Sequence, residues 1–207
     1  ISDVDFVDGP YNNTNITSTT VYASGTTGSV TVTASSSIFT ANDVGRWIRM
    51  KSPDKWGAAE ITGYTSGTQV TATVHADFEI ENSGSGNATK DWRLGAFYTG
   101  NYPTKVTFFE ERLFYANTTT HPNTVWGSST SDFDTYSPTD RDATVNADNS
   151  LTFTLSTDQV NQITGMYGGR YLHLFTKDGT FNLSSGSATQ GLTATTVTRV
   201  DGPKEGQ

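Results

Sequence analysis

The sequence contains no cysteine, which excludes a disulfide framework and a thiolate metal site. It has no run of about 18 apolar residues, so no transmembrane helix is expected, and its N-terminus lacks the charged and apolar regions of a signal peptide. We therefore expect neither a small disulfide-rich secreted domain nor membrane insertion. Because the chain begins at Ile1 rather than Met and ends on a polar tail, 201–207, we expect it to be a fragment of a longer protein.

Charged residues are also few, at 16 % of the chain, and 21 acidic against 13 basic side chains give a net charge of −8. Nonspecific binding to a nucleic acid needs clustered Lys and Arg, so this charge argues against it. A negatively charged channel wall, past which DNA moves without being bound, is compatible with the same charge.

Hydrophobic residues are scarce at 33 %, but aromatic residues reach 12 %. Disordered chains have few aromatic and β-branched residues, so the composition argues against disorder. Thr, Val, Tyr, Phe and Trp favour strands, and 20 glycines supply turns. The composition therefore predicts an all-β fold.

In the first part of the chain, short strands alternate with turns. Residues 1–17 are predicted to be an extended N-terminal segment and 18–97 a small β module, either a barrel or a sandwich. The expected strands are 29–34, 47–50, 57–64, 69–74 and 91–97, with a hairpin turn at 65–68. The best helix candidate, 39–48, is too short to stand alone, so a single turn capped by Thr40 is expected there.

The segment 98–103 contains Gly and Pro and is predicted to be a boundary. Beyond it, longer strands are expected, with starts about 8–12 residues apart, as in sandwiches, barrels and propeller blades. These strands are 106–109, 112–117, 124–128, 151–156, 162–166, 171–176 and 180–184.

The segments 106–117 and 163–176 resemble each other, about 56 residues apart. Each has an apolar start, a turn, and then an arginine, Arg112 or Arg170, that leads an aromatic-rich strand. The offset is typical of propeller blades, so 98–200 is predicted to form two propeller-like blades. Two blades cannot close a propeller. Either further blades lie outside this fragment or the two pack as an open pair; a chance likeness of two β-meanders is the third alternative.

The stretch YPTKVTFFEERLFYAN at 102–117 resembles one found in phage tail nozzle proteins, a family also called tail tubular protein B or packaged-DNA stabilisation proteins. The resemblance continues in the same order along the chain, through 6–11, 39–49, 91–96, 122–136, 151–163 and 172–186.

This resemblance implies a structural subunit of a short phage tail, without cofactors and without enzymatic activity. Such a subunit would assemble in the host cytoplasm into the virion, as a ring beneath the tail tube. Its partners would be the tail tube and neighbouring copies, and it would line the DNA exit channel and retain the packaged genome.

Acidic groups suggest chemistry at two places. A calcium loop could begin at Asp132-Phe133-Asp134, but the required Gly and Glu do not follow, so 132–148 is predicted to be a solvated loop fixed by Phe133 and Tyr136. Glu110 and Glu111 are adjacent, so on a strand they would face opposite sides and could not flank one glycosidic bond. In a turn they are ordinary hydrophilic tips.

Other catalytic patterns are missing from the sequence. The histidines, His75, His121 and His173, lie at no metal-ligand spacing, and His173 is expected on the face opposite its leucine neighbours. Neither a Gly-x-Ser-x-Gly elbow nor a phosphate-binding loop occurs. We therefore expect no catalytic, cofactor-binding or metal-binding residue.

Arginine and tryptophan form the one basic and aromatic cluster. Arg46 and Arg49 flank Trp47, and this cluster is either a subunit contact or a solvated strand edge. Trp56 is flanked by polar residues and is expected to be exposed. The possible interface is therefore Arg46, Trp47, Arg49 and Trp56. The other tryptophans, Trp92 and Trp126, lie in strand-like runs and, with Trp47, are expected to be buried.

Two other functions stay open. The first is a carbohydrate-binding β module that recognises host surface glycans through Trp56 and the Asp132–Asp148 loop. The second is a depolymerase, which rests only on the general presence of such enzymes on phage tails.

Overall fold

The computed structural model describes residues 6–52, 54–79, 84–155, 162–185, 192–193 and 198–201. Its regular elements are β-strands and two short 3-10 helices, so the predicted all-β class is confirmed. The chain divides into two compact units. The N-terminal unit comprises Phe6–Gly100 together with Thr139–Thr144, and the C-terminal unit contains the other described residues. The first five residues of the expected N-terminal segment and residues 202–207 of the expected tail lie outside the described residues.

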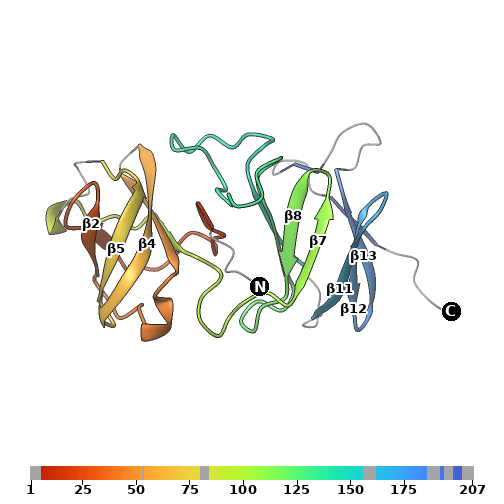
Figure 1. The fold of residues 1–207 in the computed structure, drawn as a ribbon, viewed down its shortest axis with the longest axis horizontal. Coiled ribbons are helices and arrows are strands. Elements are labelled where there is room, and N and C mark those ends of the chain that lie inside the picture. Colours follow the sequence, from red (N-terminus) through yellow and green to blue (C-terminus); the bar gives the residue numbers. More distant parts are fainter. Residues whose placement is uncertain are drawn as a thin grey trace. The chain divides into compact units, whose positions relative to one another are not determined.

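The N-terminal unit is built on one curled six-stranded antiparallel sheet, with the strand order β1-β2-β5-β4-β3-β6 (Figure 1). Its strands are β1 (Val21–Ala23), β2 (Ser29–Ala34), β3 (Trp47–Ser52), β4 (Lys55–Ser66), β5 (Gln69–Ala76) and β6 (Trp92–Leu94). The expected hairpin is confirmed, because β4 and β5 pair antiparallel across the turn between Ser66 and Gln69. The expected strands at 29–34 and 47–50 are also present, as β2 and β3, whereas within the expected strand 91–97 only Trp92–Leu94 is a strand, β6.

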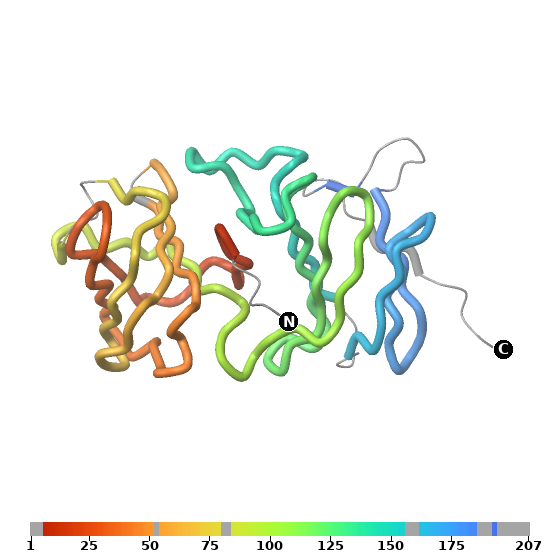
Figure 2. The backbone as a smooth tube through the Cα atoms, viewed as in Figure 1, coloured from red at the N-terminus to blue at the C-terminus, as the bar shows by residue number. Residues whose placement is uncertain are grey.

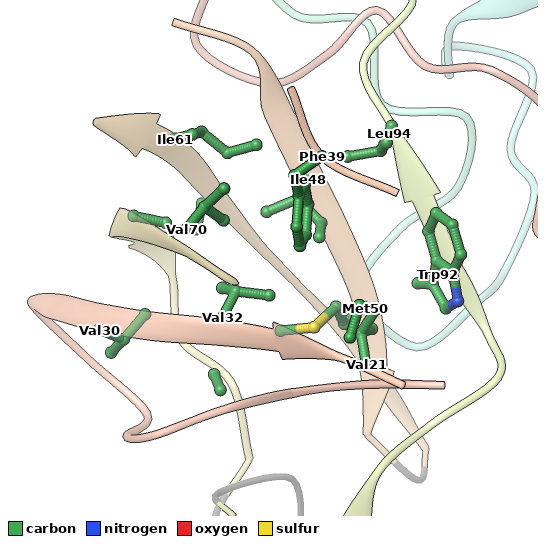
Figure 3. Close-up of a cluster of buried hydrophobic side chains, with 14 of the residues drawn as sticks. Val21, Val30, Val32, Phe39, Ile48, Met50, Ile61, Val70, Trp92 and Leu94 are labelled. Atoms are coloured by element: carbon green, nitrogen blue, oxygen red, sulfur yellow. The ribbon is translucent and has the colours of Figure 1, made fainter. Parts of the chain in front are cut away.

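The concave side of this sheet encloses the core of the unit. Alternation along β2 buries Val30 and Val32 while Thr31 and Thr33 stay half-buried. Figure 3 shows both valines with Ile48, Ile61 and Trp92, side chains that come from four different strands. The period of two in the sequence therefore sets which face of each strand becomes core.

The expected single turn is present as the 3-10 helix η1 (Ala41–Asp43), with Thr40 as its N-cap. The Thr40 backbone N–H donates to Asp43 Oδ2 at 2.6 Å, so the Asp43 side chain satisfies a donor that has no partner within the helix itself. Another 3-10 helix of the described residues, η3 (Ser85–Asn87), lies in the loop before β6 and was not predicted.

The C-terminal unit holds two four-stranded antiparallel sheets, each a meander in which consecutive strands are neighbours (Figure 2). The first has β7 (Lys105–Phe109), β8 (Arg112–Ala116), β9 (Thr124–Gly127) and β10 (Leu151–Thr154). The second has β11 (Ile163–Gly168), β12 (Leu172–Thr176), β13 (Gly179–Ser184) and β14 (Thr198–Asp201).

The seven predicted strands of this unit are all present. The fourth strand of the second sheet, β14, was not predicted. The expectation of longer strands here is wrong, since among the described residues the longest strand is β4, with 12 residues, in the N-terminal unit. The extra length of β4 comes with three irregularities in its pairing to β5, which let one strand bend with the curl of the sheet.

The two sheets of the C-terminal unit pack face to face over one apolar cluster, which includes Phe114 of β8 and Leu174 of β12. Their first strands, β7 and β11, lie side by side (Figure 1). A Cβ atom at Gly168 would stand 2.3 Å from the backbone oxygen of Phe108. Only glycine therefore permits this close approach of the two backbones.

Candidate functional site

The four residues of the possible interface lie within the N-terminal unit. On β3, Trp47 and Arg49 alternate with the core residues Ile48 and Met50 and so lie on the opposite, convex face of the sheet. That face is nevertheless covered here, because Arg49 is only 2 % exposed. Trp56 is 6 % exposed, so the expectation that it is exposed is wrong.

Two segments that are distant in sequence bury this part of the convex face. The first is the N-terminal segment, which runs along β6: Asn12 N–H donates to Leu94 O at 2.9 Å, and Ala96 N–H donates to Pro10 O at 2.7 Å. It brings the Tyr11 ring into a cluster with Trp47. The convex face is thus a second, smaller core.

The second covering segment is Thr139–Thr144, which we call the strap. Arg49 Nη2 donates to Thr139 O at 2.7 Å, and Trp56 N–H donates to Arg141 O at 2.6 Å. Arg141 in turn donates from Nε to Trp56 O at 3.2 Å and from Nη2 to Asp77 O at 2.5 Å. All of these acceptors are backbone carbonyls, and three of the four donors are arginine side-chain nitrogens, so the strap is fixed to the sheet mainly by arginine side chains.

Arg49 and Arg93 are direct partners across the β3–β6 ladder, so two guanidinium groups share one place on the sheet. Both lie over the Trp56 ring, with their Cζ atoms 5.2 and 5.5 Å from its centroid. Burial lowers the pKa of both arginines, and the neighbouring positive charge of Arg49 lowers the pKa of Arg93 further.

This arginine pair is incompletely satisfied. Within the described residues, Arg49 Nη1 and Arg93 Nε are buried without a hydrogen-bond partner, and neither arginine forms a salt bridge. Two like charges face each other across the ladder, an arrangement that destabilises the sheet. Contacts with Trp56 and the strap offset that cost.

Arg46 lies apart from this pair. Its Nη1 donates to Asp43 Oδ1 and its Nε to Gly95 O, both at 2.6 Å, and its guanidinium lies 4.3 Å from the centre of the Tyr98 ring. All its contacts are internal and tie η1 to the end of β6. The expected role of Arg46, Trp47, Arg49 and Trp56 in contacting another subunit stays a prediction.

The sequence did not indicate Tyr11, Arg93 or Arg141 as members of this cluster. Arg93 follows Trp92 in a basic and aromatic pattern like that of Arg46 and Trp47, which is a signal that could have been found. For Arg141, which lies in an acidic loop, no local pattern indicates that its side chain binds carbonyls of β4 and of Asp77.

The remaining tryptophans behave as expected. Trp47, Trp92 and Trp126 are buried, and Trp92 Nε1 donates to Thr19 O at 2.9 Å. His75 lies 4.9 Å from the Trp47 ring, between ring centres, and 3.6 Å from Glu60.

The acidic candidates each accept a separate hydrogen bond, one from a backbone group and one from a side chain. Glu110 and Glu111 form the β7–β8 turn, as expected, and both have positive φ. Glu110 accepts a hydrogen bond from the backbone of Leu192, whereas Glu111 accepts one from Ser131. The two carboxylates thus have different partners, and no group of three His, Asp or Glu side chains suited to a metal occurs in the described part of the chain.

Phe133 and Tyr136 were predicted to fix the acidic loop, and Tyr136 does so more firmly than Phe133. Tyr136 is buried and donates to Leu113 O at 3.0 Å, whereas Phe133 stays exposed and contacts Phe108 edge-on at 5.2 Å. Hydrogen bonds from Thr144, first of all from its backbone N–H, lower the pKa of Asp142.

No family model and no curated protein matches this sequence. Within the described residues, no helix has the length and apolar character needed to cross a membrane.

Proposed function

We propose that the protein is a structural component of a short bacteriophage tail, of the nozzle type, and that it acts by shape and assembly. One support is the order in which segments resembling nozzle proteins follow one another along the chain. No single segment carries this resemblance. In the proposed role the protein contacts the tail tube and further copies of itself, and DNA passes without sequence-specific binding.

The observation that carries the proposal is the build of the C-terminal unit. Two four-stranded antiparallel meanders pack face to face, and their first strands are neighbours at Gly168 and Phe108. Propeller blades are four-stranded meanders of this kind, which repeat around an axis with their faces packed against one another. We therefore interpret the two sheets as propeller-like blades and the curled sheet of the N-terminal unit as the small β module that precedes them.

The use of buried charge also favours a structural role. Arg112 donates to four backbone carbonyls, those of Ser128, Ala147, Asp148 and Asn149, at 2.5–3.4 Å. Arg49 likewise binds carbonyls of the strap. Arginine side chains that bind backbone carbonyls in this way fix loops to sheets. Such fixed loops suit a protein that lines a channel and must keep its shape.

The test is to locate the chain in phage particles. Virions of the phage that encodes it are purified on a density gradient and digested with trypsin, and the peptide 94–105 (LGAFYTGNYPTK) is quantified against a tail-tube peptide. We expect a fixed ratio to the tail tube and antibody labelling at the distal end of the tail. Particles that lack the peptide, or carry the label away from the tail, would refute the proposal.

A second measurement separates assembly from enzymatic action. The purified chain should bind immobilised tail-tube protein and release no reducing sugar from host polysaccharide. Release of sugar that one Asp or Glu substitution abolishes would instead favour the depolymerase. The glycan-binding alternative loses its basis at Trp56, because a ring buried between two arginines and the strap cannot stack on a sugar.

A further inference from the structure

The outward face of the second sheet carries a group of aromatic and amide side chains. Tyr167, His173 and Asn182 are direct partners across β11, β12 and β13, so their side chains share one face. Phe175 lies two residues beyond His173 and therefore on that face as well. We call these four residues the aromatic face; the opposite face of the sheet packs into the core of the unit.

The rings of the aromatic face are accessible and held in place. Tyr167 is 61 % exposed and Phe175 is 42 % exposed. The Tyr167 and His173 rings stack with centroids 6.0 Å apart and 23° between their planes. A Cβ atom at Gly165 would stand 3.3 Å from Phe175 Cδ2, so the missing side chain at Gly165 leaves room for the Phe175 ring against the backbone.

The polar groups between the rings have defined hydrogen-bonding roles. His173 Nδ1 and Asn182 Oδ1 are 2.7 Å apart. Because an amide oxygen can only accept, Nδ1 carries the proton, and the Nε2 atom of the neutral ring is an acceptor. The Asn182 amide nitrogen supplies two donors. A donor and an acceptor thus lie beside exposed rings, with no charged residue among the four.

The outward face of the first sheet differs in kind. Val106 and Phe108 are exposed on β7, and their partners on β8 are Tyr115 and Leu113. That face is mostly aliphatic and aromatic, which suits burial against another protein surface. The aromatic face instead mixes flat rings with neutral hydrogen-bonding groups.

We propose that the aromatic face binds a neutral carbohydrate chain, with pyranose rings stacked on Tyr167 and Phe175 and hydroxyl groups bonded to His173 and Asn182. A pyranose presents apolar C–H groups on its faces and hydroxyls around its rim, and the aromatic face offers the matching surfaces. A single-stranded nucleic acid would also stack on rings, but the net charge of −8 opposes a polyanion. This inference is independent of the proposed tail role.

The experiment uses an array of neutral bacterial polysaccharide repeats, together with maltohexaose and cellohexaose, followed by calorimetric titration of the glycan that binds best. We expect a dissociation constant below about 1 mM. Tyr167→Ala and Phe175→Ala should each weaken binding about 5- to 10-fold, as the loss of one aromatic contact would. Asn182→Leu, which keeps the size of the side chain, should weaken it similarly.

Phe108→Ala is the matched control, because it removes an exposed ring from the other sheet; affinity should stay unchanged, and thermal unfolding shows that each variant is folded. The proposal is overturned if no neutral glycan binds, or if Phe108→Ala weakens binding as much as Tyr167→Ala does. It is also overturned if oligo-dT binds in place of glycans. Self-association that Tyr167→Ala abolishes would identify the aromatic face as a contact between copies instead, which also overturns it.

Discussion

The side-chain amide of Asn117, at the end of β8, donates to the backbone oxygen of Ile163, the first residue of β11, at 2.9 Å. The N–H of Ile163 donates to Pro122 O, also at 2.9 Å. Both the N–H and the C=O of Ile163 are thereby hydrogen-bonded to the segment that joins β8 to β9 in the first sheet. Asn117 also has φ of 60°, a left-handed conformation in which Asn is more readily tolerated than most residues.

Substitution of Asn117 should therefore destabilise the C-terminal unit in two separable ways. Asn117→Ala removes the hydrogen bond and adds backbone strain, so we expect a loss of about 2–3 kcal/mol in the free energy of unfolding. Asn117→Gly removes the bond without the strain and should lose about 1 kcal/mol less. Urea unfolding of both variants checks this, and equal losses would contradict the strain component.

Arg112 and Arg170 occupy similar places in the two repeated segments, yet only Arg112 is buried and bonded to carbonyls. Arg112→Lys should lower the free energy of unfolding by about 1–3 kcal/mol, because an ammonium group cannot reproduce the planar fork of donors. Arg170→Lys, on an exposed residue beside Tyr171, should change it by less than about 0.5 kcal/mol. Similar losses in denaturant unfolding would show that Arg112 is not the specific anchor of its loop.

The facing arginines make a prediction with a defined sign. Arg49→Met and Arg93→Met each remove the same repulsion, which can be relieved only once. The double variant should therefore lose more free energy of unfolding than the two single variants together, by about 0.5–1 kcal/mol. Arg49→Met combined with the exposed Arg170→Met should be additive. A double-mutant cycle that is additive for Arg49 and Arg93 would mean that the pair does not repel.

Gly168 tests the close approach of the two sheets. Gly168→Ala would place a methyl group against the backbone oxygen of Phe108, which cannot swing aside as a side chain could, so we expect a loss of about 2 kcal/mol or more. Gly165→Ala meets only the Phe175 ring and should cost less. Gly86→Ala has open space and should be neutral or slightly stabilising. Thermal unfolding of the three variants should follow this order.

Tyr136 should make stability fall at high pH. Burial, and then the nearby Tyr115 and Asp134, raise the pKa of Tyr136. Above pH of about 10 the unfolded chain loses the Tyr136 proton while the folded protein keeps it, so at about pH 11 the folded state is penalised by roughly 1.4 kcal/mol. Below a pH of about 10 the folded and unfolded states both keep the Tyr136 proton, so the protein has its full stability there.

The Tyr136→Phe variant separates this effect from the hydrogen bond. It should lose about 1 kcal/mol at pH 8, because Leu113 O loses its donor. Between pH 8 and 11 it should then lose less stability than the unsubstituted protein. Urea unfolding at both pH values measures the difference, and parallel losses in the two proteins would contradict the raised pKa of Tyr136.

Much of the local structure could be predicted from the sequence. The strand at 29–34 was predicted and is present as β2, and Thr40 marked a single capped turn. The hairpin around 65–68 followed from its turn residues and the strands on either side. These features depend on neighbours within a few residues, because the pleat of a strand and the geometry of a turn are local properties.

The candidate sites were decided by the tertiary structure. Trp56 has polar neighbours in sequence, but the strap, more than 80 residues further along the chain, covers it. Arg112 and Arg170 look alike in sequence, but only the first meets a returning loop, to whose carbonyls it donates. The face of a strand that points away from the main core can either contact solvent or pack into a second core. Its own residues set only the alternation, and the distant segment that folds over it sets the burial.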